Sequence, residues 1–197
     1  MDKVICVYSS SSSAIATVYF QAAAELGQEI ARRRDTMLYG GGLVGLMGAV
    51  AKAVHQTGGR VVGVIPEALN VPGVVYENCD ELIITQTLRE RKAIMDQRSD
   101  AFIALPGGYG TLEELLEIIT LKQLRYHQKP IVILNINGFY DRLLKQFDQI
   151  ISERFAKPEC EKLYYITDTV DGALDYIEHY QPFQFTEKWL TDVTPSP

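Results

Sequence analysis

The chain has 197 residues, of which 47% are hydrophobic and 22% are charged, and its formal net charge is −6 at pH 7. This length and composition are ordinary for one soluble globular domain with a sizeable core. The acidic balance argues against nucleic acid or an anionic membrane as the main partner, because both call for a basic face.

The opening residues and the cysteines indicate a cytoplasmic protein. A strand pattern begins within the first residues, which predicts no signal peptide, and no apolar run approaches membrane-spanning length. Cys6, Cys79 and Cys160 are odd in number and far apart, so they indicate neither a disulfide framework nor a zinc site. The three histidines also lack ligand spacing, and we expect no metal.

Short β-rich runs alternate with helical patterns along the chain. Strands are predicted at residues 4–8, 36–39, 61–65, 82–85, 101–105, 131–136 and 164–167. Helices are predicted at residues 17–34, 45–56, 88–98, 112–125, 140–154 and 170–180. Several strand runs are continuously apolar, as strands covered on both faces are. The sequence therefore predicts a single α/β domain over residues 1–180, a doubly wound parallel sheet with helices on both faces. Residues 181–197 are expected to form a tail with a frayed end.

Loops of unusual composition follow the first two predicted strands. Residues 9–13 are five consecutive serines, which fit either a flexible polar loop or a hydroxyl-lined wall of a ligand site. Residues 40–45 read Gly-Gly-Gly-Leu-Val-Gly, which satisfies the Gly-x-Gly-x-x-Gly pattern of dinucleotide-binding loops. Glu67 stands about where that pattern requires a ribose-binding acid. The pattern usually follows the first strand, however, and close packing of helix and strand is another reason for these glycines.

The helix predicted at residues 88–98 opens with cations. Arg89, Arg91 and Lys92 lie in its first turns, where the helix dipole makes positive charge unfavourable. Arg91 follows Leu88 by three residues and precedes Met95 by four, so it shares their face of the helix. An inward charge requires an anionic partner. That partner is a carboxylate in a structural ion pair, a catalytic carboxylate or a substrate phosphate.

Residues 106–114, Pro-Gly-Gly-Tyr-Gly-Thr-Leu-Glu-Glu, lie between a predicted strand and a predicted helix. The glycines permit backbone angles and close approaches that other residues do not. The helix start presents free N–H groups and the positive end of the helix dipole. This combination predicts an anion cradle whose expected occupant is a phosphate. Thr111 and Glu114 also fit a Thr-x-x-Glu capping box, which is the alternative interpretation of Glu114.

Residues 40–48, residues 106–114 and the pair Arg91-Lys92 together resemble the LOG (Lonely Guy) family of cytokinin-activating phosphoribohydrolases. The likeness runs from about residue 4 to residue 180. It implies a Rossmann-like nucleotide-binding hydrolase domain, a homodimer, and hydrolysis of nucleoside 5′-monophosphates to a free base and ribose 5-phosphate. In the family pattern Pro-Gly-Gly-x-Gly-Thr-x-x-Glu the last residue is catalytic, which falls on Glu114. The arginine before lysine is its catalytic partner, which falls on Arg91.

The motifs also supply the expected substrate-binding residues. These are Ser11, Gly41, Gly42, Met47, Arg91, Lys92, Gly107, Gly108, Tyr109, Gly110, Thr111, Glu113 and Glu114. The chain departs from the family in places: residues 9–12 are serines where members often have Cys-Gly-Ser-Ser, and residues 88–90 replace a common Met-His before Arg-Lys. Gly73 stands where plant members place a substrate-contacting glutamate. These departures leave the preferred base open.

The expected reaction is hydrolysis of the N-glycosidic bond of adenosine 5′-monophosphate, plain or N6-modified, giving adenine or a cytokinin and ribose 5-phosphate. Glu114 stabilises the positive sugar and activates water, and Arg91 holds Glu114 ionised by lowering its pKa. No metal or redox cofactor is needed. Two other classes stay open: a non-catalytic nucleotide or cofactor carrier on the same fold, and an NAD-dependent oxidoreductase that uses residues 40–45. In a homodimer, the apolar tail around Phe183, Phe185 and Trp189 is expected to cover a neighbouring surface.

Overall fold

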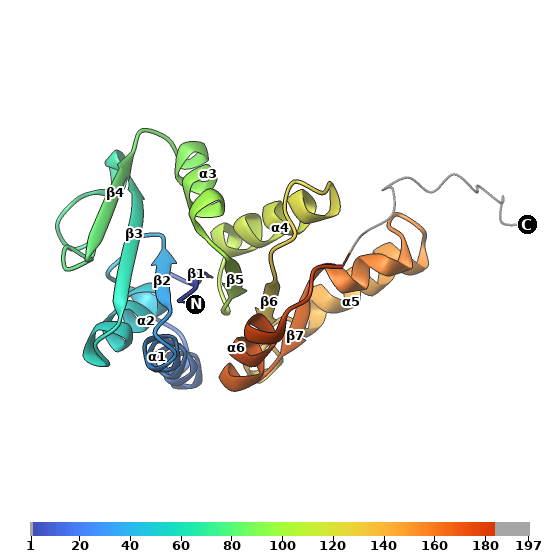
Figure 1. Ribbon diagram of the computed structural model, residues 1–197, viewed down its shortest axis with the longest axis horizontal. Coiled ribbons are helices and arrows are strands. Elements are labelled where there is room, and N and C mark those ends of the chain that lie inside the picture. Colours follow the sequence, from blue (N-terminus) through green and yellow to red (C-terminus); the bar gives the residue numbers. More distant parts are fainter. Residues whose placement is uncertain (1, 184–197) are drawn as a thin grey trace, which may run out of the picture.

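The computed structural model describes residues 2–183, and these residues are organised around one seven-stranded sheet (Figure 1). All six pairings between its strands are parallel. The strands are β1 (Val4–Tyr8), β2 (Thr36–Tyr39), β3 (Arg60–Pro66), β4 (Glu81–Thr85), β5 (Ala101–Ala104), β6 (Ile131–Leu134) and β7 (Tyr165–Thr167). Their order across the sheet is β4-β3-β2-β1-β5-β6-β7. The predicted doubly wound α/β fold is therefore confirmed.

Six α-helices of residues 2–183 cover the two faces of the sheet. They are α1 (Thr17–Arg32), α2 (Gly45–Gln56), α3 (Leu88–Arg98), α4 (Tyr109–Gln123), α5 (Asp141–Ser152) and α6 (Val170–His179). Short 3₁₀ helices occur at η1 (Glu67–Leu69), η2 (Ile136–Gly138) and η3 (Pro158–Leu163). Helices α1, α2 and α6 pack on one face, and α3, α4 and α5 pack on the other (Figure 1). Within residues 2–183, no helix combines the length and the apolar character needed to cross a membrane.

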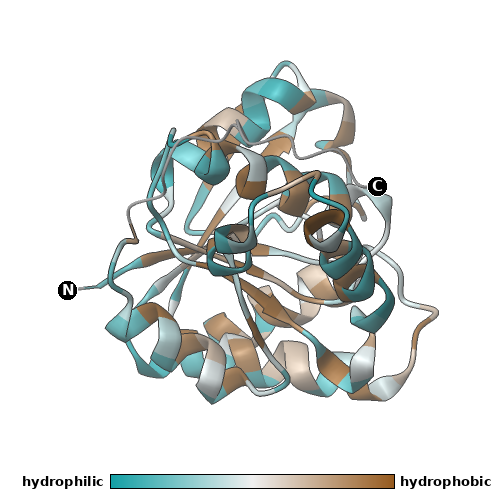
Figure 2. Ribbon diagram, turned by 90° about the vertical axis from the view of Figure 1, so that its right-hand side faces the viewer, coloured by the Kyte–Doolittle hydropathy of each residue, from teal (hydrophilic) through white to brown (hydrophobic). Residues whose placement is uncertain are grey.

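The two hydrophobic cores follow from the alternation of side chains along each strand. In β1, Ile5 and Val7 belong to the core under α1, α2 and α6, whereas Cys6 and Tyr8 belong to the core on the opposite face. Successive strand side chains point to opposite faces, so a strand buried on both sides is apolar at every position. Figure 2 shows this concentration of hydrophobic residues along the strands.

All seven predicted strands and six predicted helices are present. Most boundaries agree within two residues, and the exception that matters for function is the start of α4. This helix begins at Tyr109 rather than at residue 112, and its N-cap is Gly108. No side chain caps it. Thr111 therefore lies inside the helix, and the capping-box interpretation of Glu114 is wrong.

The order of the strands places a switch point beside β1. From β1 the chain adds β2, β3 and β4 outward on one side, and then returns to place β5 on the other side of β1. The loops that leave β1 and β5 consequently diverge. Doubly wound sheets bind their ligands in the crevice that opens at this position, outside the carboxyl ends of the strands.

Candidate active site

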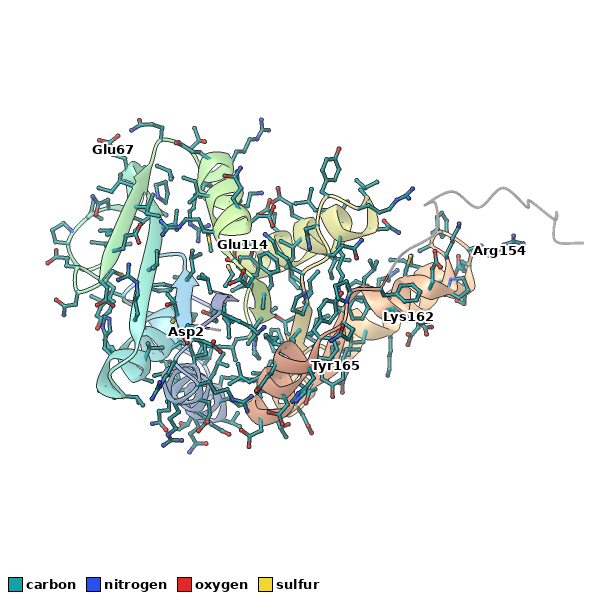
Figure 3. The ribbon with its side chains drawn as sticks, viewed as in Figure 1. Asp2, Glu67, Glu114, Arg154, Lys162 and Tyr165 are labelled. Carbon is teal, nitrogen blue, oxygen red and sulfur yellow. The ribbon has the colours of Figure 1, made fainter. Side chains whose placement is uncertain are left out.

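A cleft opens at this switch point. It encloses about 510 Å³, which lies within the range of small-molecule sites. The loops after β1 and β2, the 3₁₀ helix η1 and the starts of α3 and α4 contribute to it. The lining residues are Ser9, Ser10, Ser11, Ser12, Gly40, Met47, Leu69, Leu88, Arg91, Gly108, Tyr109, Gly110, Thr111 and Glu114. Figure 3 shows Glu114 on α4 where this helix faces α3.

The start of α4 presents unoccupied backbone donors to the cleft. Within the part of the chain that the structure describes, the N–H groups of Tyr109, Gly110 and Thr111 donate to no protein acceptor. A Cβ atom added to Gly107 would lie 2.1 Å from the Oγ1 atom of Thr111, so glycine is required there for Thr111 to occupy its buried position. Free N–H groups and the positive end of a helix dipole favour an anion. The start of α4 therefore presents the free donors that the predicted phosphate cradle requires.

Arg91 reaches the cleft from α3 and forms an ion pair with Glu114 of α4. Its Nη1 atom donates to Glu114 Oε1 at 2.7 Å, and its Nε atom donates to the backbone oxygen of Val64 at 2.9 Å. The two side chains are 12% and 11% exposed. Arg91 thus has the inward orientation and the anionic partner that the sequence pattern predicts. Since both groups line the cleft, the ion pair belongs to the candidate site.

The environment of Glu114 raises the pKa of its carboxyl above the ordinary value. Burial is the largest cause, and the charge and hydrogen bond of Arg91 act in the opposite direction. Arg91 lowers the pKa as predicted, but burial outweighs it, so the net direction is the reverse of the expected one. A carboxylate with a raised pKa is a stronger base, which suits the removal of a proton from water.

The glycine-rich start of α2 is already occupied by the protein. The N–H groups of Leu46 and Met47 donate to the backbone oxygen of Ser10 at 2.9 and 3.3 Å. The Gly45 N–H donates to Ser13 Oγ at 3.3 Å. These bonds use the donors that a dinucleotide-binding loop offers to a pyrophosphate. The arrangement argues against the dinucleotide interpretation, and it explains the serine run as the loop that caps α2 and lines the cleft.

Eight of the predicted site residues line the cleft, and five do not. Those outside the lining are Gly41, Gly42, Lys92, Gly107 and Glu113. Gly41 accepts from the Tyr76 N–H at 2.8 Å, so its backbone is engaged with the loop after β3. Lys92 Nζ pairs with Glu113 and, at 2.5 Å, with Glu117. This group of three charges bridges α3 and α4 outside the cleft.

Several cleft residues were absent from the predicted set. They are Ser9, Ser10, Ser12, Gly40, Leu69 and Leu88. Most of them come from segments that follow the carboxyl ends of strands, a signal that is available from the sequence. The Ser9 hydroxyl is buried and has no hydrogen-bond partner among the described residues. In the same residues, no group of three or more His, Cys, Asp or Glu side chains is arranged to hold a metal ion.

Comparison with known proteins identifies relatives over most of the chain. A family model described as "Possible lysine decarboxylase" matches residues 47–177. A probable cytokinin riboside 5′-monophosphate phosphoribohydrolase of Oryza sativa subsp. japonica is 44% identical over 181 residues, which cover 92% of this chain and 86% of the relative. A cytokinin riboside 5′-monophosphate phosphoribohydrolase of Arabidopsis thaliana is 42% identical over 192 residues, which cover 96% and 90%.

Solved structures share the fold at lower sequence identity. The molybdenum cofactor carrier protein of Chlamydomonas reinhardtii superposes with a TM-score of 0.68 at 24% identity, covering 90% of this chain and 97% of that one. The molybdenum cofactor binding protein of Rippkaea orientalis gives a TM-score of 0.69 at 23% identity, with coverage of 90% and 96%. At this level of identity the likeness supports the fold alone, because one fold hosts many functions.

Proposed function

Because this chain belongs to the LOG family of phosphoribohydrolases, we propose that it hydrolyses the N-glycosidic bond of adenosine 5′-monophosphate or an N6-modified derivative. The products are the free base, adenine or a cytokinin, and ribose 5-phosphate. The observation that carries the proposal is the ion pair of Arg91 and Glu114, which lies in the same cleft as the open start of α4.

The lining of the cleft suits the three parts of such a substrate. The 5′-phosphate binds the free N–H groups at the start of α4 and the Thr111 hydroxyl. The serine loop offers hydroxyl groups to the ribose, among them the unpartnered Ser9 hydroxyl. Met47, Leu69 and Leu88 provide an apolar wall for the base and its substituent. Leu69 and Leu88 are largely exposed in the structure, so contact with a base buries apolar surface there.

In the proposed reaction, water attacks the anomeric carbon of the ribose. A bond forms between the water oxygen and that carbon while the bond to the base nitrogen breaks, and the leaving base takes the electron pair and one proton. Glu114 accepts the proton of the water and stabilises the positive charge that develops on the sugar. Arg91 orients Glu114 and contacts ribose or phosphate. The chain needs no metal or redox cofactor for these steps.

The proposal accounts for the cleft better than its alternatives do. A carrier of an anionic nucleotide or cofactor has no use for a carboxylate beside its phosphate site, since like charges repel. An NAD-dependent oxidoreductase needs the donors of α2 that Ser10 and Ser13 occupy. A pyridoxal-phosphate decarboxylase needs a lysine for its Schiff base, and the described lining of the cleft contains none.

A panel of nucleoside monophosphates tests the proposal directly. The purified chain is incubated with the monophosphates of adenosine, N6-prenyladenosine, guanosine, cytidine and uridine, and the products are separated by chromatography. Release of a free base and ribose 5-phosphate from an adenosine monophosphate is the expected result. Binding of these nucleotides with no release from any of them would favour the carrier function.

We further propose a cytoplasmic homodimer, on the strength of the family resemblance. Phe183 packs under Lys162 of its own chain, with the ammonium 4.4 Å from the ring centre, whereas Phe185 and Trp189 lie outside the described residues. Light scattering of the intact chain at micromolar concentration is expected to give about twice the chain mass, as closed two-fold assemblies do. An active monomer would contradict the assembly without affecting the proposed reaction.

A further inference from the structure

A second cavity lies between α3 and α4, behind the candidate active site. Its volume is about 170 Å³, and Tyr8, Lys92, Asp96 and Glu117 are among the side chains that line it. Glu114 lines it as well, and within the described residues Glu114 is the one side chain shared by this cavity and the cleft. Glu114 therefore connects the lining of the two spaces. We call the second space the rear cavity.

The lining of the rear cavity is suited to water. Lys92 Nζ and Glu117 Oε2 are 2.5 Å apart, and Asp96 Oδ1 accepts from Lys129 Nζ at 3.3 Å. Tyr8 is almost fully buried, and burial raises the pKa of its hydroxyl, so the hydroxyl stays protonated at neutral pH. A polar cavity of this size holds several water molecules, since each needs about 30 Å³ and two to four polar partners.

Hydrolysis requires that water reach Glu114 and that a proton leave it, and the cleft alone provides a restricted route for both. Each turnover consumes one water molecule, and the proton that Glu114 accepts must leave before the next turnover. The Glu114 side chain is only 11% exposed and lines the cleft, so a nucleotide bound in the cleft is expected to restrict the access of solvent to it from that side. Glu114 also lines the rear cavity, and the lining of this cavity includes three exposed residues of α3, Arg89, Ala93 and Gln97, through which it can exchange water with solvent.

We propose that the rear cavity supplies the hydrolytic water to Glu114 and carries its proton away. This inference rests on the proposed hydrolysis. In the reaction, water from the cavity gives its oxygen to the anomeric carbon and one proton to Glu114. That proton leaves through the cavity water to bulk solvent, and the departing base takes one proton from solvent, so each turnover consumes one water molecule and releases no net proton. Ala93 is the smallest of the exposed lining residues, so a larger side chain at this position is expected to narrow the access of solvent to the cavity.

Filling the opening tests the inference. Ala93→Phe places an aromatic ring at the opening of the cavity, and Ala93→Ser is the matched control because it adds a single oxygen atom. Gln97→Phe narrows the same opening from the next turn of α3. For both phenylalanine variants we expect kcat to fall on the order of tenfold or more while KM stays near the wild-type value. Calorimetric affinity for ribose 5-phosphate, which needs no water, is expected to stay unchanged.

The outcomes separate this inference from the proposed function. Failure of the wild-type chain to hydrolyse any nucleotide would remove the function, and the inference with it. With an active wild type, normal kcat in both phenylalanine variants would overturn the water route alone. Equal losses of kcat and of ribose 5-phosphate affinity in both variants would also overturn it, because the cavity would then merely support the shape of the cleft. A loss of kcat in both phenylalanine variants, with unchanged affinity for ribose 5-phosphate and with normal kcat in Ala93→Ser, supports the water route.

Discussion

Gly40 and Arg91 lie so close together that a side chain at position 40 would displace the Arg91 guanidinium. A Cβ atom added to Gly40 would lie 2.1 Å from Arg91 Nη2. The backbone of Gly40 has no positive φ, so the requirement for glycine comes from the guanidinium and not from the turn. The glycine motif after β2 therefore makes room for the cation that holds Glu114, a role separate from phosphate binding.

We predict that Gly40→Ala displaces the guanidinium and lowers kcat/KM for an adenosine monophosphate on the order of tenfold or more. Steady-state assays measure the loss, and circular dichroism checks that the variant remains folded. Gly40→Ala in an Arg91→Ala background is the informative control, because residues that act through one contact give non-additive losses. Fully additive losses would show that Gly40 acts independently of Arg91.

The pH dependence of kcat/KM is predicted from the environment of Glu114 in the free protein. Burial raises its pKa above the ordinary value of 4.5, against the opposing effect of Arg91. The base must be ionised to accept a proton, so activity falls as pH decreases through the raised pKa, and the acid limb lies above pH 4.5. We specify kcat/KM because its pH profile reports the groups of the free enzyme, whereas that of kcat reports the enzyme–substrate complex. An acid limb retained in the residual activity of Glu114→Gln would assign it to another group.

The fold could be predicted from sequence because its signals are local. Continuous apolar runs gave the buried strands, and the alternation of strands with helical patterns gave the parallel sheet. The inward orientation of Arg91 could also be predicted from a local signal, because it follows from the spacing of Arg91 to Leu88 and Met95 on one helix. These features depend on the periodicity of an element and not on what that element packs against.

The errors at the site have a different origin, because they depend on contacts between distant segments. Glycine is a poor helix former, so Gly110 made the first turn of α4 difficult to predict. The spacing of Thr111 and Glu114 also matches that of a capping box, although Thr111 lies within the helix. The hydrogen bonds from the first N–H groups of α2 to the backbone oxygen of Ser10 join the loops after β1 and β2, so the sequence of either loop alone does not predict them. The pairing of Lys92 with Glu113 links two helices, so the placement of both residues outside the cleft lining cannot be predicted from their adjacency to the sequence motifs.

A requirement for the 5′-phosphate is predicted from the open start of α4. Binding energy from the phosphate positions the sugar against Glu114, and such energy appears in the rate as well as in the affinity. Adenosine is expected to give a kcat/KM on the order of a hundredfold or more below that of its monophosphate. Competition by inorganic phosphate or ribose 5-phosphate provides an independent check. Equal turnover of nucleoside and nucleotide would remove the phosphate role of residues 108–111.

Replacement of Glu114 by glutamine tests the catalytic role of this residue. Glutamine is nearly isosteric and its amide oxygen still accepts from Arg91, so the fold and nucleotide affinity are expected to change little. It carries no charge and cannot take a proton from water. We predict a loss of kcat on the order of a hundredfold or more. Arg91→Ala is expected to lower kcat as well, and the double variant should fall short of the product of the two losses.

The matched comparison for Glu114→Gln is Glu113→Gln, which makes the same chemical change one position earlier on α4. The Glu113 carboxylate is 58% exposed and pairs with Lys92 outside the cleft, and exposed pairs of this kind contribute little to stability. Its kcat is therefore expected to stay within about twofold of wild type. Thermal unfolding of both variants checks that neither loss comes from misfolding. Near-normal kcat in Glu114→Gln, or equal losses in the two variants, would exclude Glu114 as the general base.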